Sequence, residues 1–300
     1  MNRTLRKSFG QLFLTIPSMG WLFVFFLIPT IIVATIAFRP YDFRGTMGIG
    51  QGWTLDSLRA VLDKEYPIIV FRTLWVSVAT TVICLVAGIV MAYYMARISE
   101  RAKKMMLLLT VIPFWTSFII RIFAWTQVLR SDGILQRTLA FLHLIPSDAT
   151  LMYNMQAVLL VMVYTSLPFA ILPLYAAAEK FDFQLMDAAM DLGATRFQAL
   201  MATFIPGIRS GILFAALMVF VPNLGSYVAP EVIGGTDCYL VGNRIKEFAL
   251  DARNLPYACA TSLFLMLSVL VMLLCGMLII RWKEGRGGIA RMARQMQEVA

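Results

Sequence analysis

Few residues in this sequence have the types and spacing that enzyme chemistry requires. His143 is the only histidine, and the four cysteines show no paired spacing: Cys84, Cys238, Cys259 and Cys275. No Asp or Glu falls inside the long apolar runs described below. Metal ligation needs clustered His, Cys or carboxylate side chains, and catalysis needs a reactive constellation facing a cavity. The sequence therefore predicts no metal site, no disulfide framework and no enzyme activity.

The most unusual polar residues lie together inside one apolar run. Pro222, Asn223, Gly225 and Ser226 place a helix breaker, an amide, a glycine and a hydroxyl within five positions. Proline removes a backbone hydrogen bond, and such breaks are tolerated in a membrane chiefly where they line a cavity or pack within protein. We predict that this stretch lines a path through the membrane. The alternative is close helix packing through its small residues.

Membrane-spanning helices must position these residues. Hydrophobic residues make up 60% of the 300 residues and charged residues 14%, and the mean hydropathy is +0.76, which is too apolar for a soluble domain. A helix needs about 20 mostly apolar residues to cross the hydrocarbon core. Six runs qualify, at about 12–38, 68–96, 105–128, 155–178, 209–229 and 258–281. The expected fold is an all-α integral membrane protein in which residues 1–300 form one transmembrane domain with six helices.

The distribution of positive charge predicts the orientation. The net charge of +9 could indicate nucleic-acid binding, but Lys and Arg gather in alternate loops, as the positive-inside rule requires. If the N-terminus is cytoplasmic, the inner side carries 15 of these residues and the outer loops carry 9. We therefore expect both termini in the cytoplasm and no nucleic-acid partner. The longest inner loop then covers residues 179–208.

This inner loop has the pattern of two short helices. Gly193 separates them, Thr195 is suited to cap the second, and Pro206 is expected to close the unit. Leu185, Ala188, Ala189 and Leu192 recur at helical spacing and predict a small apolar ridge. Such a ridge suits insertion into a groove on a partner protein. A helix lying on the membrane surface explains the same periodicity equally well.

The loop resembles the EAA loop of ABC-importer permeases. In that family Glu-Ala-Ala is followed at fixed spacing by Gly and then by Ile-x-Leu-Pro. Here Asp187-Ala188-Ala189 is followed by Gly193 and then by Thr203-Phe204-Ile205-Pro206. Three positions depart from the pattern, because Asp187, Thr203 and Ile205 replace the glutamate, isoleucine and leucine. Asp187 keeps the carboxylate on a side chain shorter by one methylene.

The resemblance implies a type I ABC-importer permease fold and a coupling role for this loop. In the family the loop is a helix that sits in a cleft of the ATP-binding subunit and transmits its closure to the permease. The residues placed in this role are Asp187, Ala188, Ala189, Asp191, Gly193 and Pro206. The sequence has no G-x-x-x-x-G-K-[ST] phosphate loop, so ATP and Mg are expected on a partner ATPase, and no cofactor is expected on this chain.

A narrower resemblance covers most of the chain. Residues 111–117, 120–121, 132–135, 167–175, 222–235, 240–243 and 253–256 are similar to the spermidine and putrescine importer permeases, the PotB type. This resemblance implies polyamine transport across a bacterial inner membrane. It also implies a second permease subunit, two ATPase subunits and an extracytoplasmic binding protein. Related branches of the family carry iron, thiosulfate or amino-acid derivatives.

A polyamine is a multivalent cation, so its path should offer carboxylates, amide oxygens and aromatic faces. The candidates are Trp115, Tyr164, Asn223, Tyr227 and Glu231. Core packing or interfacial anchoring is the alternative for the Trp and the two Tyr residues, and a solvated loop acid is the alternative for Glu231.

Arg121 is the charged residue least suited to such a path. A cation at membrane depth costs roughly 2.5 to 3.5 kcal/mol on insertion scales and would repel a polyamine. We expect it to pair with the carboxylate of Asp132, Glu231 or Asp237, or to extend to the outer surface. Its predicted role, with that of Asp132, is structural or gate-stabilising.

Two other classes of transporter compete with this interpretation. An ion-coupled secondary transporter usually has buried carboxylates and internal repeats, and the sequence shows neither. An ABC permease for an anion or a metal complex remains compatible with the coupling loop.

Overall fold

The computed structural model describes residues 17, 19–41, 52–62, 65–146 and 150–274. Every regular element in these ranges is helical, which confirms the all-α prediction. The chain divides into two compact units, residues 65–244 and residues 1–64 with 245–300. Four helices are long and apolar enough to span a membrane alone, and two bent pairs raise the number to six.

The unit formed by the two ends of the chain contains two of these helices. One covers Met19–Ala37 and includes α2 (Ile28–Ala37) after a π-helical turn at Phe23–Leu27. The other covers Leu255–Leu274 and follows a π-helical turn at Glu247–Asp251. A short helix α3 (Asp56–Val61) lies between them in the sequence. The described residues do not include the first residues of the predicted run 12–38 or the last residues of the run 258–281. Cys275 and both termini also lie outside them.

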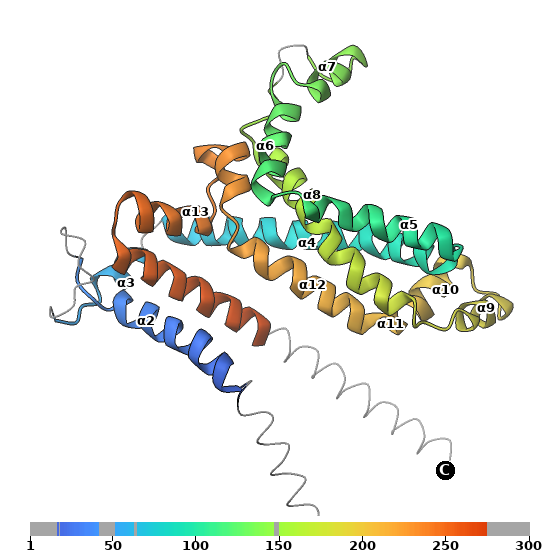
Figure 1. Cartoon of the computed structure of the whole chain (residues 1–300), viewed down its shortest axis with the longest axis horizontal. Helices are drawn as coiled ribbons and strands as arrows, with labels where there is room; N and C mark the ends of the chain where they lie inside the picture. The colour runs from blue at the N-terminus through green and yellow to red at the C-terminus, as the bar shows by residue number, and fades with distance from the viewer. Residues whose placement is uncertain (1–16, 18, 42–51, 63–64, 147–149, 275–300) are drawn as a thin grey trace, which may run out of the picture. The chain divides into compact units, whose positions relative to one another are not determined.

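Three long helices make the core of the larger unit. They are α4 (Glu65–Arg97), α8 (Met155–Ala178) and α12 (Arg209–Leu224), and each packs against the other two (Figure 1). Small residues allow this close approach: a Cβ atom on Gly211 would lie 2.4 Å from the Cβ of Ala177, and one on Gly88 would lie 2.8 Å from Leu174 Cδ1. Because lipid tails remove the hydrophobic drive between helices, close van der Waals contact of this kind holds membrane bundles together.

The predicted run 105–128 forms a bent pair of helices that together are apolar enough for one span. Helix α5 (Glu100–Val111) passes through a 3₁₀ turn (Ile112–Trp115), and α6 (Phe118–Leu129) starts in a new direction. The helices on the two sides of the break meet at 94°. Pro113 has no N–H, and its carbonyl accepts hydrogen bonds from the Thr116 hydroxyl and N–H, at 2.8 and 3.4 Å. These bonds satisfy the carbonyl where the helical ladder stops.

The chain continues beyond α6 in α7 (Ile134–Phe141), which follows a tight turn at Arg130–Gly133. A second bend of 73° separates the helix Arg196–Gly207 from α12. Within the larger unit, α9 (Gln184–Asp191) and α10 (Arg196–Ala199) lie near the Arg97 end of α4 (Figure 1).

The segment after α12 is fastened to the other end of α4. It contains π- and 3₁₀-helical turns at Pro230–Gly234 and Thr236–Cys238 and then α13 (Val241–Lys246). The N–H of Val241 donates to Thr73 Oγ1 at 3.0 Å, and Arg72 donates to the carbonyl of Asp237. The two ends of the bundle are therefore built from different segments.

We predict that Gly211→Ala destabilises the larger unit, because the added methyl group would overlap Ala177. Overpacking of a close helix contact costs about 1 to 3 kcal/mol. Thermal unfolding in detergent measures the change. Gly20→Ala is the matched control, since no atom of the described residues lies within 4 Å of the added Cβ. Equal midpoints for the two variants would contradict the proposed close approach.

Candidate coupling loop and translocation path

The loop between α8 and α12 is fixed by hydrogen bonds within its own sequence. The carboxylate of Asp182 accepts from the Gln184 N–H at 3.0 Å, at the start of α9. Gly193 ends α9 with φ of 90°, a left-handed conformation that favours glycine. The N–H groups of Gly193 and Ala194 donate to the carbonyls of Met190 and Ala189, at 2.9 and 3.1 Å. These two bonds form the Schellman motif that commonly terminates helices.

The next helix begins two residues after Gly193 with a complete capping box. Thr195 Oγ1 accepts from the Gln198 N–H at 3.3 Å, and Gln198 Oε1 accepts from the Thr195 N–H at 2.8 Å. This reciprocal pair satisfies two donors at the start of α10. The predictions that Gly193 separates two helices and that Thr195 caps the second are confirmed. The angle between α9 and α10 is thus specified locally.

The predicted apolar ridge of α9 divides between two faces. Leu185, Ala188 and Leu192 are exposed, and Leu192 is 90% exposed. Ala189 instead packs toward the hydrophobic core of the larger unit, together with Met186 and Met190. The outer face therefore carries two leucines and a small residue at helical spacing, and the exposed side chains of Asp187 and Asp191 lie beside them.

Pro206 lies at the end of the two-helix unit, where it was expected, one residue before the second helix ends at Gly207. The second helix continues from α10 through a π-helical turn (Leu200–Phe204) into α11 (Ile205–Gly207). Pro206 lies in the first turn of α11, where a missing N–H is tolerated. The bend follows at Ile208, whose φ and ψ are −98° and 15°.

An aromatic cluster joins the loop to α4. Phe204 is fully buried, and its ring centroid lies 5.2 Å from that of Phe181, 5.4 Å from Tyr93 and 5.9 Å from Phe183. Offset and edge-to-face aromatic pairs at such distances contribute more than their buried area alone. A Cβ atom on Gly207 would lie 2.4 Å from the Phe181 ring, so the helix backbone touches the cluster directly.

An ionic cluster joins the start of the loop to α5. Lys103 Nζ lies 2.7 Å from Glu100 Oε1 and 3.4 Å from Glu179 Oε1, and the Tyr175 hydroxyl donates to Glu179 at 2.7 Å. The Tyr175 hydrogen bond, followed by that of Lys103, holds the pKa of Glu179 below its usual value. Sequence reasoning missed both clusters. The available signal for the aromatic cluster was the presence of Phe181 and Phe183 just before the EAA-like segment and of Phe204 near its end.

Asn223 does not face an open path. Its side chain is 5% exposed and lies between α12 and α8. The amide Nδ2 donates to Ser166 Oγ at 2.9 Å and to the Val219 carbonyl at 2.6 Å. Of the two alternatives for this stretch, the structure therefore favours helix packing at Asn223 itself. Ser166 was missed because it lies 57 residues away in the sequence.

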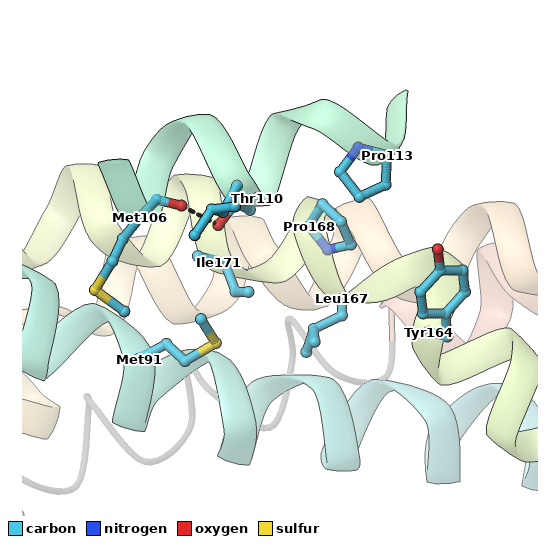
Figure 2. A pocket seen from close by; sticks show the side chains of 9 residues that line it. Met91, Met106, Thr110, Pro113, Tyr164, Leu167, Pro168 and Ile171 are labelled. Atoms are coloured by element: carbon cyan, nitrogen blue, oxygen red, sulfur yellow. Dashed lines mark hydrogen bonds between the residues drawn. The ribbon is translucent and has the colours of Figure 1, made fainter. Parts of the chain in front are cut away.

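Tyr164 lines an apolar cavity of about 240 Å³ between α4, α5 and α8. Figure 2 shows Pro113, from the 3₁₀ turn after α5, and Pro168, from within α8, on its wall. The Thr110 hydroxyl in this wall already donates to the Met106 carbonyl at 2.8 Å. The ring of Tyr164 packs edge-on against Trp125 at 5.3 Å. This wall has no carboxylate and little polar surface for a cation.

Trp115, Tyr227 and Glu231 occupy other parts of the larger unit. Trp115 is 79% exposed in the 3₁₀ turn at the break between α5 and α6, so core packing does not explain it. Tyr227 is 43% exposed, and its carbonyl accepts from Asn243 Nδ2 at 2.9 Å and from the Glu231 N–H at 3.0 Å. Glu231 is half-buried in the turn Pro230–Gly234.

Arg121 lacks the carboxylate partner that we expected. Its guanidinium carbon lies 5.6 Å from the ring centroid of Phe114 and 5.9 Å from that of Phe118. Its buried Nε and Nη1 atoms have no hydrogen-bond partner among the described residues. Asp132 is exposed in the turn before Gly133. Aromatic faces therefore take the place of the predicted ion pair.

Comparison with known proteins identifies the family. Residues 84–286 match the family described as binding-protein-dependent transport system inner membrane component. The chain belongs to this family. The matched range contains the whole coupling loop, both bent helix pairs and the residues predicted to line a path. The chain is accordingly a multi-pass protein of the inner membrane.

Similar members of the family are named as polyamine permeases. The spermidine/putrescine transport system permease protein PotB of Salmonella typhimurium strain LT2 is 33% identical over 267 residues, 89% of this chain and 91% of PotB. PotB of Haemophilus influenzae is 35% identical over 244 residues, 81% of this chain and 85% of that protein. The narrower resemblance seen in the sequence is thus confirmed.

A solved transporter shares the fold. A chain of the bacterial ABC transporter involved in import of the acidic polysaccharide alginate superposes with a TM-score of 0.67 and 18% identity, over 91% of this chain and 96% of that chain. At this identity the likeness shows the architecture alone. It confirms the predicted ABC-importer permease fold.

We predict that Ser166 and Asn223 contribute to stability as a pair. Asn223→Ala and Ser166→Ala should each lower the free energy of unfolding, with a coupling energy of about 0.6 kcal/mol, as is typical of interhelical hydrogen bonds in membranes. A double-mutant cycle in detergent measures this coupling. Strictly additive effects, or loss of transport by Asn223→Ala at unchanged stability, would favour the original assignment of Asn223 to the path.

Proposed function

We propose that this chain is the permease subunit of an ATP-driven importer that moves polyamines across the bacterial inner membrane. The observation that carries the proposal is its similarity to spermidine/putrescine permeases over nearly the whole length of both chains. The coupling loop supports the same assignment, because its two short helices occur at the spacing of the EAA loop.

We propose that a separate ATPase subunit supplies the energy and binds ATP and Mg. The exposed face of α9, with Leu185, Ala188 and Leu192, offers an apolar ridge that would otherwise remain in water. Burial of such a ridge in a partner groove is favourable by about 25 cal/mol per Å² of apolar surface. Asp187 and Asp191 flank the ridge and are suited to contact basic or hydrogen-bonding groups on the same partner.

The clusters beneath the loop account for the transmission of movement. A displacement of α9 acts on α4 through Tyr93 and Phe204, and on α5 and α8 through Lys103 and Glu179. Packed side chains transmit such displacements because protein interiors are close-packed and resist compression. In this proposal the helices rotate as rigid bodies, and the bends after Trp115 and Gly207 change their angle to accommodate the rotation.

Cargo passes, in this proposal, between this chain and a second permease subunit. A polyamine needs anionic or aromatic partners for its ammonium groups. The apolar cavity beside Tyr164 does not offer them, whereas Trp115 and Tyr227 are exposed and Glu231 is half-buried. These three residues are the proposed cargo contacts. An extracytoplasmic binding protein delivers the polyamine and supplies most of the selectivity.

A different cargo within the same architecture is the second candidate. The guanidinium of Arg121 has two buried nitrogen atoms without hydrogen-bond partners among the described residues, and such a group suits an anion better than a cation. Under this alternative the importer carries another small solute, and Arg121 contacts it.

The test is uptake of labelled putrescine and spermidine by the complete transporter in liposomes, with each polyamine also used as an unlabelled competitor of the other. We expect saturable uptake that requires ATP and the binding protein. Glu231→Gln should reduce the maximal rate, and Asp237→Asn, at an exposed position in the same segment, is the control for general loss of negative charge. A complex that hydrolyses ATP but moves neither polyamine would exclude the polyamine assignment and retain the ABC architecture.

A further inference from the structure

A second cavity, of about 520 Å³, lies where α4 ends beside the coupling loop. Tyr93, Tyr94 and Arg97 contribute from α4, and Met186, Met190 and Arg196 contribute from α9 and α10. The cavity is therefore bounded by a membrane-spanning helix on one side and by the coupling helices on the other. We place the cavity at the level of the membrane surface, because it lies at the end of α4, which is apolar until its last turn.

Both arginines in this wall lack an acidic partner. Neither Arg97 nor Arg196 forms an ion pair with any carboxylate in the described part of the chain. The carboxylates of α9, Asp187 and Asp191, are exposed and do not line the cavity. The carbonyl end of α4 by itself disfavours an anion here, so the two guanidinium groups supply the positive potential.

Arg97 is held in place by uncharged groups. Its Nη1 donates to the Tyr93 hydroxyl at 2.6 Å, and its guanidinium carbon lies 5.5 Å from the ring centroids of both Tyr93 and Phe183. A guanidinium has five N–H donors in a planar fork that matches phosphate oxygens. The tyrosine and the aromatic rings therefore orient Arg97 and leave donors for a ligand.

We propose that this cavity binds the headgroup phosphate of an anionic phospholipid, with Arg97 and Arg196 as its contacts. The apolar part of the wall, Met186 and Met190, is suited to the glycerol and upper acyl chain. Basic pockets at the cytoplasmic face of membrane helices commonly take such headgroups. A lipid bound here touches α4 and the coupling helices together and thereby favours one position of the loop.

The test is lipid retention by the purified transport complex, measured by native mass spectrometry with phosphatidylglycerol and with phosphatidylcholine. We expect one phosphatidylglycerol to remain bound, and the double variant Arg97→Gln with Arg196→Gln to bind it about 30-fold more weakly, since each basic residue near a membrane contributes about a fivefold factor. Arg101→Gln with Lys104→Gln is the matched control, because it removes the same charge from exposed positions of α5 that do not line the cavity.

Two additional measurements keep the test decisive if the double variant is unstable. Met190→Trp fills the cavity without changing charge and should also release the lipid. Inorganic phosphate should compete weakly, because it lacks the apolar part of the ligand. Equal loss in the matched control, equal retention of phosphatidylcholine, or full displacement by inorganic phosphate would overturn the proposal. Loss of the ATPase subunit from the double variant would instead assign the two arginines to protein docking. None of these outcomes depends on which solute the transporter carries.

Discussion

The need to satisfy every backbone polar group within the membrane governs where this chain can depart from a helix. An unpaired N–H or carbonyl in hydrocarbon costs several kcal/mol, so each break must supply its own partners. At the break after Trp115 the hydroxyl and the N–H of Thr116 donate hydrogen bonds to the Pro113 carbonyl. The coupling loop lies outside the apolar runs, and there the Schellman motif at Gly193 and the capping box at Thr195 supply partners for the ends of two helices. The breaks are thus hydrogen-bonded structures with a defined geometry.

The coupling loop combines this local definition with long-range attachment. Its helices keep their mutual angle through bonds within a few residues, and Phe204 and Glu179 attach them to α4 and α5. The exposed face of α9 is left for a partner, while its inner face joins the core. In the function proposed above, a loop built in this way would act as a rigid lever between an ATPase subunit and the membrane helices.

The sequence predicted features that depend on composition or on neighbouring residues. Apolar runs indicated the long helices, and the Gly193 break and the Thr195 cap were confirmed because both motifs span only a few positions. Interactions between distant segments could not be predicted in the same way. Asn223 pairs with Ser166 on another helix, and Arg121 lies near the rings of Phe114 and Phe118 without an acidic partner among the described residues, because tertiary packing decides which side chains meet. The hydropathy pattern located the run 105–128 but not the angle of its bend, because a straight and a bent apolar helix have the same pattern.

The central claim is that the outer face of α9 docks on an ATPase subunit. The most direct measurement is site-specific photocrosslinking in native membranes, with a photoreactive phenylalanine at Leu192, which is 90% exposed on that face. Tyr153, 65% exposed and just before the start of α8, is the matched position. The account predicts a crosslink from position 192 to the ATPase subunit and none from position 153. A crosslink from position 192 to lipid alone, in a complex that still hydrolyses ATP, would contradict it.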